Sequence, residues 1–224
     1  MLEAELQELL SQYSDQQTDD GNAVVVRKWS FTGAGTGVNH IKSFFNSLGR
    51  FLGITQPSDV TNLLYGKIVA QARNILFYEA YGVPDTVAGR FDLITLHAYV
   101  VMRRLKEFGE VGAETSQNLF DVMFTDMDRN MREMGVGDLS VGRKVKKLAI
   151  SFYGRVKAYD EGIEQGDDTL IAALRRNIYG DVEPNRQCLM AVQEYLYREI
   201  ERSRDWTLEN ISTGAINFGP IKER

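Results

Sequence analysis

The chain has 224 residues, of which 43% are hydrophobic and 25% charged, and its formal net charge is −5. This length and composition are typical of a globular protein with one sizeable core, and they exclude disordered, collagen-like and disulfide-rich classes. Because Cys188 is the single cysteine, the chain forms neither an intramolecular disulfide nor a cysteine-based zinc site.

The charge is unevenly distributed along the chain. Residues 1–20 carry six acids and no Lys or Arg, so the remaining residues sum to +1. That sign is wrong for a secretory signal or a mitochondrial presequence. The apolar stretch at residues 93–102 is shorter than the roughly 20 residues that span a bilayer. We therefore expect a cytoplasmic protein.

Residues 1–40 are expected to form an N-terminal extension. A short acidic helix is followed by a short strand or β-hairpin at residues 23–31 and by a glycine-rich loop at residues 33–37. The loop lacks both the third glycine of a dinucleotide fingerprint and the Gly-Lys-Ser/Thr of a phosphate loop, so we reject a nucleotide site.

Residues 41–56 form a basic amphipathic segment. Its apolar stripe is flanked by Lys42 and Arg50 and is suited either to packing on its own domain or to a membrane surface. The candidate membrane-surface residues are Ile41, Phe44, Phe45, Leu48, Phe51 and Leu52.

The rest of the chain is expected to be all-α, a single compact multi-helix domain at residues 57–204 with an irregular C-terminal tail at residues 205–224. No proline lies between Pro84 and Pro184, and apolar residues recur there at helical spacing. Gly135 and Gly137 predict a turn between two of the helices. The expected helices cover residues 58–78, 85–105, 115–134, 140–156, 168–178 and 184–202.

Catalytic and metal-binding patterns are weak in this sequence. Residues 126–137 begin like a calcium-binding loop, but Met131 and Gly137 replace the glycine and the glutamate that such a loop needs. Neither His40 nor His97 has the glutamate three residues earlier that a di-metal bundle uses. We expect no enzyme, no metal and no cofactor.

Two further patterns favour packing. His97 lies in an apolar helix and is interpreted as a hydrogen-bonded core histidine, against a catalytic role with Asp126 or Asp128. A methionine series at helical spacing is more often adaptable packing than a client-binding surface. Its members are Met123, Met127, Met131 and Met134.

The helix at residues 140–156 carries positive charge without a compensating acid. Lys144, Lys147 and Arg155 lie along one stripe, apart from the apolar positions. Such a stripe is usually a solvated face, but six positive charges within residues 139–159 also favour docking to RNA or to a phospholipid surface. We expect no DNA partner. The expected basic docking face comprises Arg143, Lys144, Lys146, Lys147 and Arg155.

The central residues resemble the ubiquinol–cytochrome c chaperone family. The resemblance lies in residues 91–105, 120–138 and 152–155, and residues 65–86 are similar to bacterial members. It implies a helical, non-enzymatic assembly factor. Mitochondrial members act on newly made cytochrome b near the ribosomal tunnel exit, together with a small partner protein. Because the presequence is missing, we expect a bacterial protein in the cytoplasm or on the inner face of the cytoplasmic membrane.

By this resemblance, the client is nascent cytochrome b and the partners are the ribosome and a small companion assembly protein. The alternative is a peripheral membrane scaffold anchored by residues 41–52. The resemblance also implies structural or client-contact roles for particular side chains. The expected client or partner contacts are His97, Arg104, Asp126, Asp128, Arg132, Tyr153 and Arg155.

Overall fold

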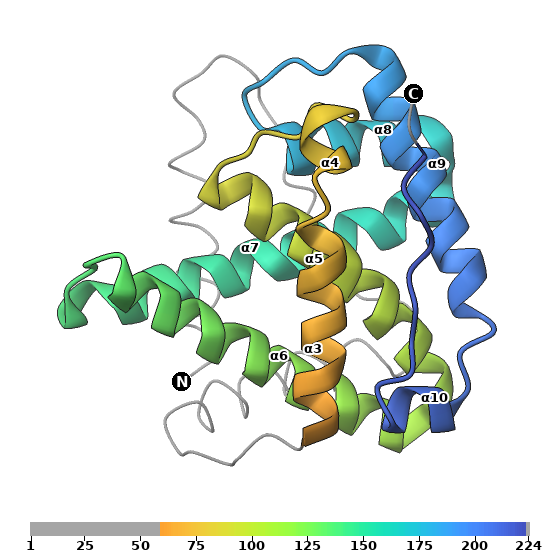
Figure 1. Ribbon diagram of the computed structural model, residues 1–224. Helices are drawn as coiled ribbons and strands as arrows, with labels where there is room; N and C mark the ends of the chain where they lie inside the picture. Colours follow the sequence, from red (N-terminus) through yellow and green to blue (C-terminus); the bar gives the residue numbers. More distant parts are fainter. Residues whose placement is uncertain (1–58, 223–224) are drawn as a thin grey trace, which may run out of the picture. The chain divides into compact units, whose positions relative to one another are not determined.

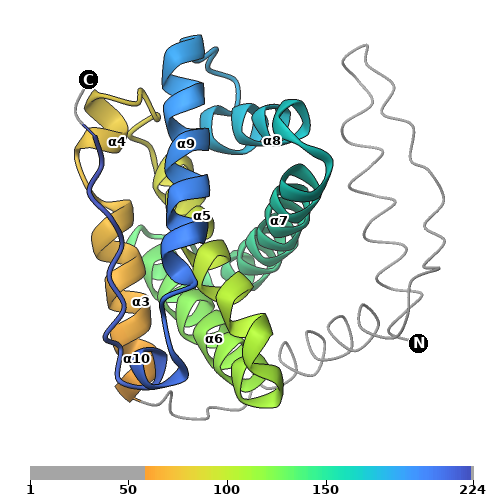
Figure 2. The same cartoon turned by 90° about the vertical axis from the view of Figure 1, so that its right-hand side faces the viewer.

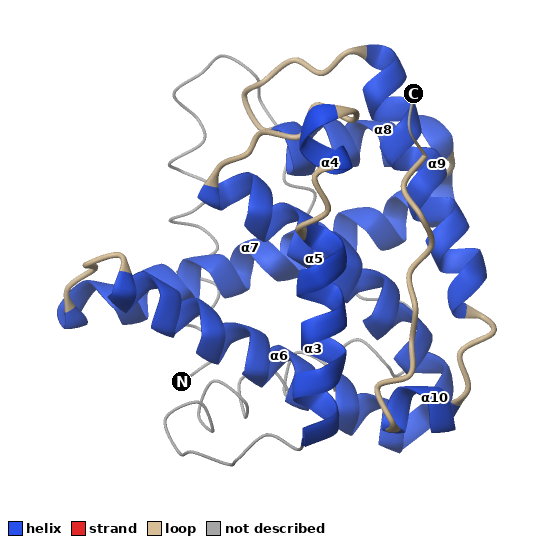
Figure 3. Cartoon of the chain, in the orientation of Figure 1, coloured by secondary structure: helices blue, strands red, loops and turns tan. Residues whose placement is uncertain are grey.

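The chain divides into two units, Met1–Lys42 and Ser43–Arg224. The computed structural model describes residues 59–222, which belong to the second unit, are mainly helical and contain no strand (Figure 3). The all-α prediction is therefore confirmed for this part of the chain. The expected β-hairpin, the glycine-rich loop and the amphipathic segment at 41–56 lie outside the described residues.

The helices follow one another through short connections (Figure 1). Their bounds are α3 (Asp59–Ala72), α4 (Leu76–Glu79), α5 (Val87–Leu105), α6 (Gly109–Glu133), α7 (Asp138–Gln165), α8 (Asp167–Leu174), α9 (Arg186–Ser203) and α10 (Leu208–Ser212). The 3-10 turn η1 (Lys106–Phe108) joins α5 to α6, and the π-helical turn η2 (Arg175–Tyr179) continues α8.

The first predicted helix is two helices in the structure. The chain leaves α3 after Ala72, and the Asn74 side chain accepts a hydrogen bond from the backbone N–H of Leu76 at 3.1 Å. Asparagine competes in this way with the helical hydrogen-bond ladder, which explains the break.

Helix α5 is the central element of the domain. Every residue from 91 to 101 is buried, and the helix packs against α3, α6, α7 and α9. A helix that is buried all round belongs in the middle of a bundle. Its first turn is capped by the Thr86 hydroxyl, which accepts the N–H of Gly89 at 3.0 Å.

Helices α6 and α7 form an antiparallel hairpin. The chain reverses at Gly135, whose φ of 83° favours glycine, and α7 then begins after Gly137. In Figure 1 the turn of this hairpin lies at the far left, away from α9 on the right. The predicted turn is therefore confirmed. The hairpin closes through aromatic packing of Phe120 against Phe152, with ring centroids 5.7 Å apart.

The segment expected as an irregular tail belongs to the core. Trp206, Ile216 and Ile221 are buried, and α10 starts with a capping box formed by Thr207 and Asn210. Figure 2 shows the last residues running beside α3 and α9. The tail prediction missed this packing because the segment has no long helical periodicity, and its partners lie far away in sequence.

Candidate functional site

A buried hydrogen-bond network surrounds His97. The His97 Nδ1 lies 2.7 Å from the Leu93 carbonyl oxygen and Nε2 lies 2.9 Å from the Tyr195 hydroxyl. In the tautomer that satisfies both contacts, Nδ1–H donates to Leu93 and Nε2 accepts from Tyr195. The Tyr195 oxygen also accepts a hydrogen bond from Gln71 at 2.9 Å. The network therefore joins α5, α9 and α3.

The same network holds the C-terminal segment. Gln71 Nε2 also donates to the carbonyl of Gly219 at 2.9 Å, and the N–H of Gly219 donates to the buried carboxylate of Glu199 at 2.8 Å. Arg198 and Arg202 lie 3.5 and 3.6 Å from that carboxylate. A buried carboxylate requires such partners, since an unpaired charge in the interior is costly.

Burial fixes the chemistry of His97. The side chain is 0% exposed, and edge-on aromatic contacts with Phe77 and Phe218 enclose it at centroid distances of 5.4 and 5.0 Å. Burial lowers the pKa of His97 to about 4, so the ring is neutral at pH 7.

The expectation that His97 contacts a client is therefore wrong for this structure, because no part of the ring reaches the surface. The catalytic pairing of His97 with Asp126 or Asp128 is also wrong. Both ring nitrogens are occupied by Leu93 and Tyr195, whereas Asp126 contacts Tyr65 and Arg129 and Asp128 contacts Arg132. The interpretation of His97 as a hydrogen-bonded core histidine agrees with these contacts.

Arg155 turns inward from α7 instead of joining the basic face. Its Nη2 lies 2.7 Å from Asp92 Oδ1 on α5, with side-chain exposures of 20% and 8% respectively. Burial raises the pKa of Asp92 to about 6, and the positive charge of Arg155 opposes that shift. Arg155 is thus a partly buried link between α5 and α7, which corrects its assignment to the docking face.

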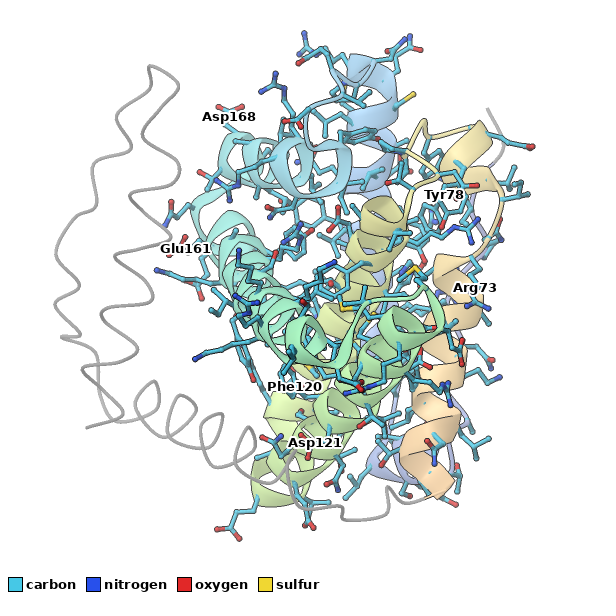
Figure 4. The ribbon with its side chains drawn as sticks, turned by 90° about the vertical axis from the view of Figure 1, so that its left-hand side faces the viewer. Arg73, Tyr78, Phe120, Asp121, Glu161 and Asp168 are labelled. Carbon is cyan, nitrogen blue, oxygen red and sulfur yellow. The ribbon has the colours of Figure 1, made fainter. Side chains whose placement is uncertain are left out.

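Arg104 and Tyr153 also serve packing in this structure. The Arg104 Nε donates to the carbonyl oxygen of Trp206 at 2.9 Å, and its guanidinium lies 4.5 Å from the ring centre of Phe108. The ring of Tyr153 contacts Phe120 at 5.4 Å between centroids and is 37% exposed, so part of it faces solvent. Figure 4 shows Phe120 on α6, where α6 and α7 lie together.

The remaining motif residues stabilise the hairpin. The Tyr65 hydroxyl donates to Asp126 at 2.8 Å and ties α6 to α3. Arg132 pairs with Asp128 on its own helix at 2.6 Å and with Asp138 at the start of α7. Arg132 therefore bridges the two ends of the turn. The side chains of Arg132, Asp128 and Asp138 are half-exposed or exposed.

Four residues of the predicted basic docking face remain on α7. Arg143, Lys144 and Lys147 are exposed and Lys146 is half-buried. Among the residues that the structure describes, no carboxylate lies within ion-pair distance of any of the four. The basic docking face therefore consists of these four residues, without Arg155. That this face docks to a partner stays a prediction.

The hairpin turn adds an apolar surface that the sequence analysis did not identify. Leu139 is 93% exposed and Met134 is 55% exposed. The other methionines of the series face inward, since Met123 is fully buried and Met127 and Met131 pack against the core. The packing interpretation therefore holds for three of the four methionines.

A shallow pocket lies between α9 and the C-terminal segment, with a volume of about 440 Å³. Met190, 50% exposed, is its most accessible apolar side chain, and its charged lining consists of Arg198 and the Lys222–Glu194 ion pair at 2.7 Å. Within residues 59–222, no cluster of three or more His, Cys, Asp or Glu side chains is arranged to hold a metal ion. None of the helices in this range is long and apolar enough to cross a membrane.

Asp92, Tyr195 and Glu199 are key polar positions that were not predicted from the sequence. Asp92 had a usable signal, because an acid within an otherwise apolar helical run requires a buried partner. Tyr195 and Glu199 had none, since their partners Gln71 and Gly219 come from distant parts of the chain.

The described residues form a helical domain in which both ring nitrogens of His97 are used in internal contacts, and comparison with known proteins identifies the class of this protein. The family described as ubiquinol-cytochrome C chaperone matches residues 79–218. The chain therefore belongs to the ubiquinol–cytochrome c chaperone family.

Named relatives agree with this assignment. The chain is 27% identical over 154 residues to ubiquinol-cytochrome-c reductase complex assembly factor 1 of Xenopus laevis, which covers 66% of this chain and 74% of that protein. It is 28% identical over 148 residues to the mitochondrial protein CBP3 of Saccharomyces cerevisiae, covering 64% of this chain and 44% of that protein. It spans half the length of the human assembly factor 1.

A solved structure has a similar fold. The crystal structure of the Cbp3 homolog from Brucella abortus superposes with a TM-score of 0.66 and 31% identity, covering 81% of this chain and 97% of that chain. The predicted family is thus confirmed by sequence and by fold.

Proposed function

We propose that this protein is a non-enzymatic assembly chaperone that binds newly made cytochrome b and supports the assembly of ubiquinol–cytochrome c reductase. The observation that carries the proposal is the family match over residues 79–218, together with relatives that are named as assembly factors of that reductase. A ribosome near its tunnel exit and a small companion protein are the proposed partners.

The interior of the domain supports a binding role over a catalytic one. The His97 ring, the Asp92–Arg155 pair and the Glu199 carboxylate each connect two or more segments of the chain. Their polar atoms hold helices together, so binding to a client falls to the surface of the domain.

The pocket beside Met190 is the proposed contact for an apolar client segment. It combines an accessible methionine, whose flexible side chain adapts to different apolar partners, with a polar rim of Arg198 and the Lys222–Glu194 ion pair.

Deletion of the gene tests the function most directly. We expect lower cytochrome b content and lower ubiquinol–cytochrome c reductase activity in membranes, both restored by a plasmid copy. Normal levels of both in the deletion strain would refute the proposal.

Crosslinking during translation tests the client contact. A photoreactive residue at Met190 is expected to crosslink to nascent cytochrome b, whereas one at Val87, which is 66% exposed on α5, serves as the matched control. Equal crosslinking at both positions would remove the pocket from the proposal.

The peripheral membrane scaffold remains the alternative because of the apolar stripe at residues 41–52, which lies outside the described residues. Partner recovery separates the two functions. A chaperone recovers nascent cytochrome b and ribosomes, whereas a scaffold is recovered with lipid irrespective of client. A chain that begins at Gln56 and binds liposomes unchanged would exclude the anchoring role of that stripe.

A further inference from the structure

Exposed apolar side chains at the turn of the α6–α7 hairpin lie next to the basic residues of α7. Leu139 is 93% exposed and is the most exposed of the large hydrophobic side chains that the structure describes, with Met134 at 55% on the other side of the turn. Scattered apolar side chains are ordinary on a protein surface. An almost wholly exposed leucine at the tip of a hairpin requires a more specific explanation.

The basic residues of α7 lie directly behind this tip. Positions 139, 143 and 146 are spaced four and three residues apart, so Leu139, Arg143 and Lys146 share one helix face, with Lys147 adjacent. At 1.5 Å of rise per residue, the cations lie about 6–12 Å along the helix from the leucine. The opposite face, with Val141 and Val145, is buried.

The nearby acids do not cancel this charge. Asp138 pairs with Arg132, and Glu133 lies 4.0 Å from Arg129, so the two acids nearest the turn each have an arginine neighbour. Residues 126–147 contain six basic and four acidic side chains. The excess is carried by Arg143, Lys144, Lys146 and Lys147, for which the described part of the chain provides no carboxylate partner.

We infer that the α6–α7 hairpin docks on an anionic phospholipid surface, with Leu139 and Met134 entering the interface between headgroups and acyl chains. The basic residues of α7 then lie at the depth of the lipid phosphates. An apolar edge that enters by 5–10 Å, followed by Lys and Arg, is the arrangement that peripheral membrane helices use. Lysine and arginine also extend their apolar stems while the charge stays with the headgroups.

A bilayer explains this surface better than RNA does. Three of the four cations are lysines, and the exposed side chains at the turn are aliphatic, whereas single-stranded RNA is bound through aromatic stacking platforms. Leu139 lacks the aromatic ring on which a base would stack. The inference does not depend on cytochrome b, because lipid binding is a property of the purified protein alone.

Vesicle co-sedimentation with the full chain tests the inference. We expect binding to phosphatidylcholine vesicles that contain about one third phosphatidylglycerol, weaker binding as salt is raised, and little binding to vesicles of phosphatidylcholine alone. Equal binding to both vesicle types would contradict the inference.

Paired variants then locate the contact. Arg143→Gln with Lys147→Gln is expected to weaken the partition coefficient about 25-fold, because each basic residue near an anionic surface contributes roughly fivefold. Met134→Ser with Leu139→Ser is expected to weaken it about tenfold or more through lost apolar burial. All four positions are exposed, so the thermal unfolding midpoint should be unchanged.

Matched controls use equally exposed residues elsewhere. Val87 and Val182, at 66% and 51% exposure, control for the apolar pair. The exposed Lys67 and Arg186 control for the basic pair. Val87→Ser with Val182→Ser, and Lys67→Gln with Arg186→Gln, are each expected to change binding less than twofold.

Three results would overturn the inference. Hairpin and control variants could lose binding equally, which would indicate a non-specific effect of charge or hydrophobicity. Hairpin variants could bind anionic vesicles unchanged, which would place the contact elsewhere, for example at residues 41–52. Hairpin variants could also lose affinity for a fluorescent single-stranded RNA while vesicle binding persists, which would make this a nucleic-acid surface.

Discussion

The region around His97 and the α6–α7 hairpin use polar side chains in opposite ways. Around His97, polar groups from α3, α5, α9 and the C-terminal segment are buried and are joined to one another by hydrogen bonds. On the hairpin, the ion pairs of Arg132 lie in solvent, and Lys144 and Lys147 extend from the surface. Substitution should therefore change stability in the first region and binding in the second.

The difference follows from solvation. A buried polar atom that loses its partner incurs a desolvation cost, whereas an exposed one simply bonds to water. Motif residues of the family occur in both regions, so belonging to the motif does not by itself make a residue a contact. Arg155 and Lys144 illustrate this, since they lie on one helix and differ in whether a carboxylate is within reach.

The largest expected effect is that of Phe77→Ala. Its ring is fully buried and contacts His97 and Tyr195 at centroid distances of 5.4 and 5.0 Å. Removal of a buried phenylalanine lowers the free energy of unfolding by about 3–5 kcal/mol, which urea denaturation measures. Leu139→Ala on the hairpin is the control and should leave the urea midpoint unchanged. Equal losses in the two variants would remove the distinction between the regions.

Arg155→Met is expected to lower the free energy of unfolding by about 2–3 kcal/mol at pH 8. This loss is smaller than that expected for a fully buried ion pair, because Arg155 is partly exposed. The variant leaves the Asp92 carboxyl without its cation, so the pKa of Asp92 rises further above about 6. Below pH 6 the Asp92 carboxyl is mostly protonated in both the wild type and the variant, so the difference in their free energies of unfolding becomes smaller. Urea denaturation at pH 5 and pH 8 checks this, and a loss that is the same at both values would contradict it.

His97→Gln is expected to change the pH dependence of stability. The pKa of His97 is about 4 in the folded protein and about 6.5 in an unfolded chain. Between these values only the unfolded chain takes up the proton, so His97 makes the protein less stable as pH falls. Asp92, whose folded pKa is raised to about 6, acts in the opposite direction.

The difference between wild type and His97→Gln isolates the histidine contribution, because Asp92 is common to both. We expect the stability advantage of the wild type to shrink by about 1.5 kcal/mol between pH 6.5 and pH 5. Thermal or urea unfolding at these two pH values measures it. An advantage that stays constant would mean that the ring is not held neutral.

The smallest expected effect on stability is that of Lys144→Glu with Lys147→Glu. Both side chains are exposed, and exposed substitutions of this kind change stability by less than about 0.5 kcal/mol. The same variant should lose salt-sensitive association with anionic partners. Marked destabilisation, measured by urea denaturation, would show that the basic face has a structural role.

Much of the helical architecture could be predicted from local pattern. The apolar spacing of α5 through α9 and the glycines at 135 and 137 indicate helices and a turn without reference to distant residues. The break between α3 and α4 was missed because one side chain, Asn74, replaces a backbone contact. The burial of Ile216 and Ile221 was missed because the segment has no helical period of its own.

The candidate site was predicted less completely. Helical geometry groups Lys144, Lys147 and Arg155 along one stripe of α7, and the first two are exposed in the structure. The long side chain of Arg155 instead reaches Asp92 on a different helix. The exposed Leu139 gave no signal because a leucine beside a glycine-rich turn is equally compatible with burial.

The helical class, the family resemblance and the excess of positive charge on one helix can all be predicted from the amino-acid sequence, because each is a property of residues close together in the chain. Tertiary structure alone decided that His97 and Glu199 hold the C-terminal segment, that Arg155 is a partner of Asp92, and that Leu139 faces solvent. The reason is that the environment of a polar or apolar side chain is set by neighbours that only folding brings together.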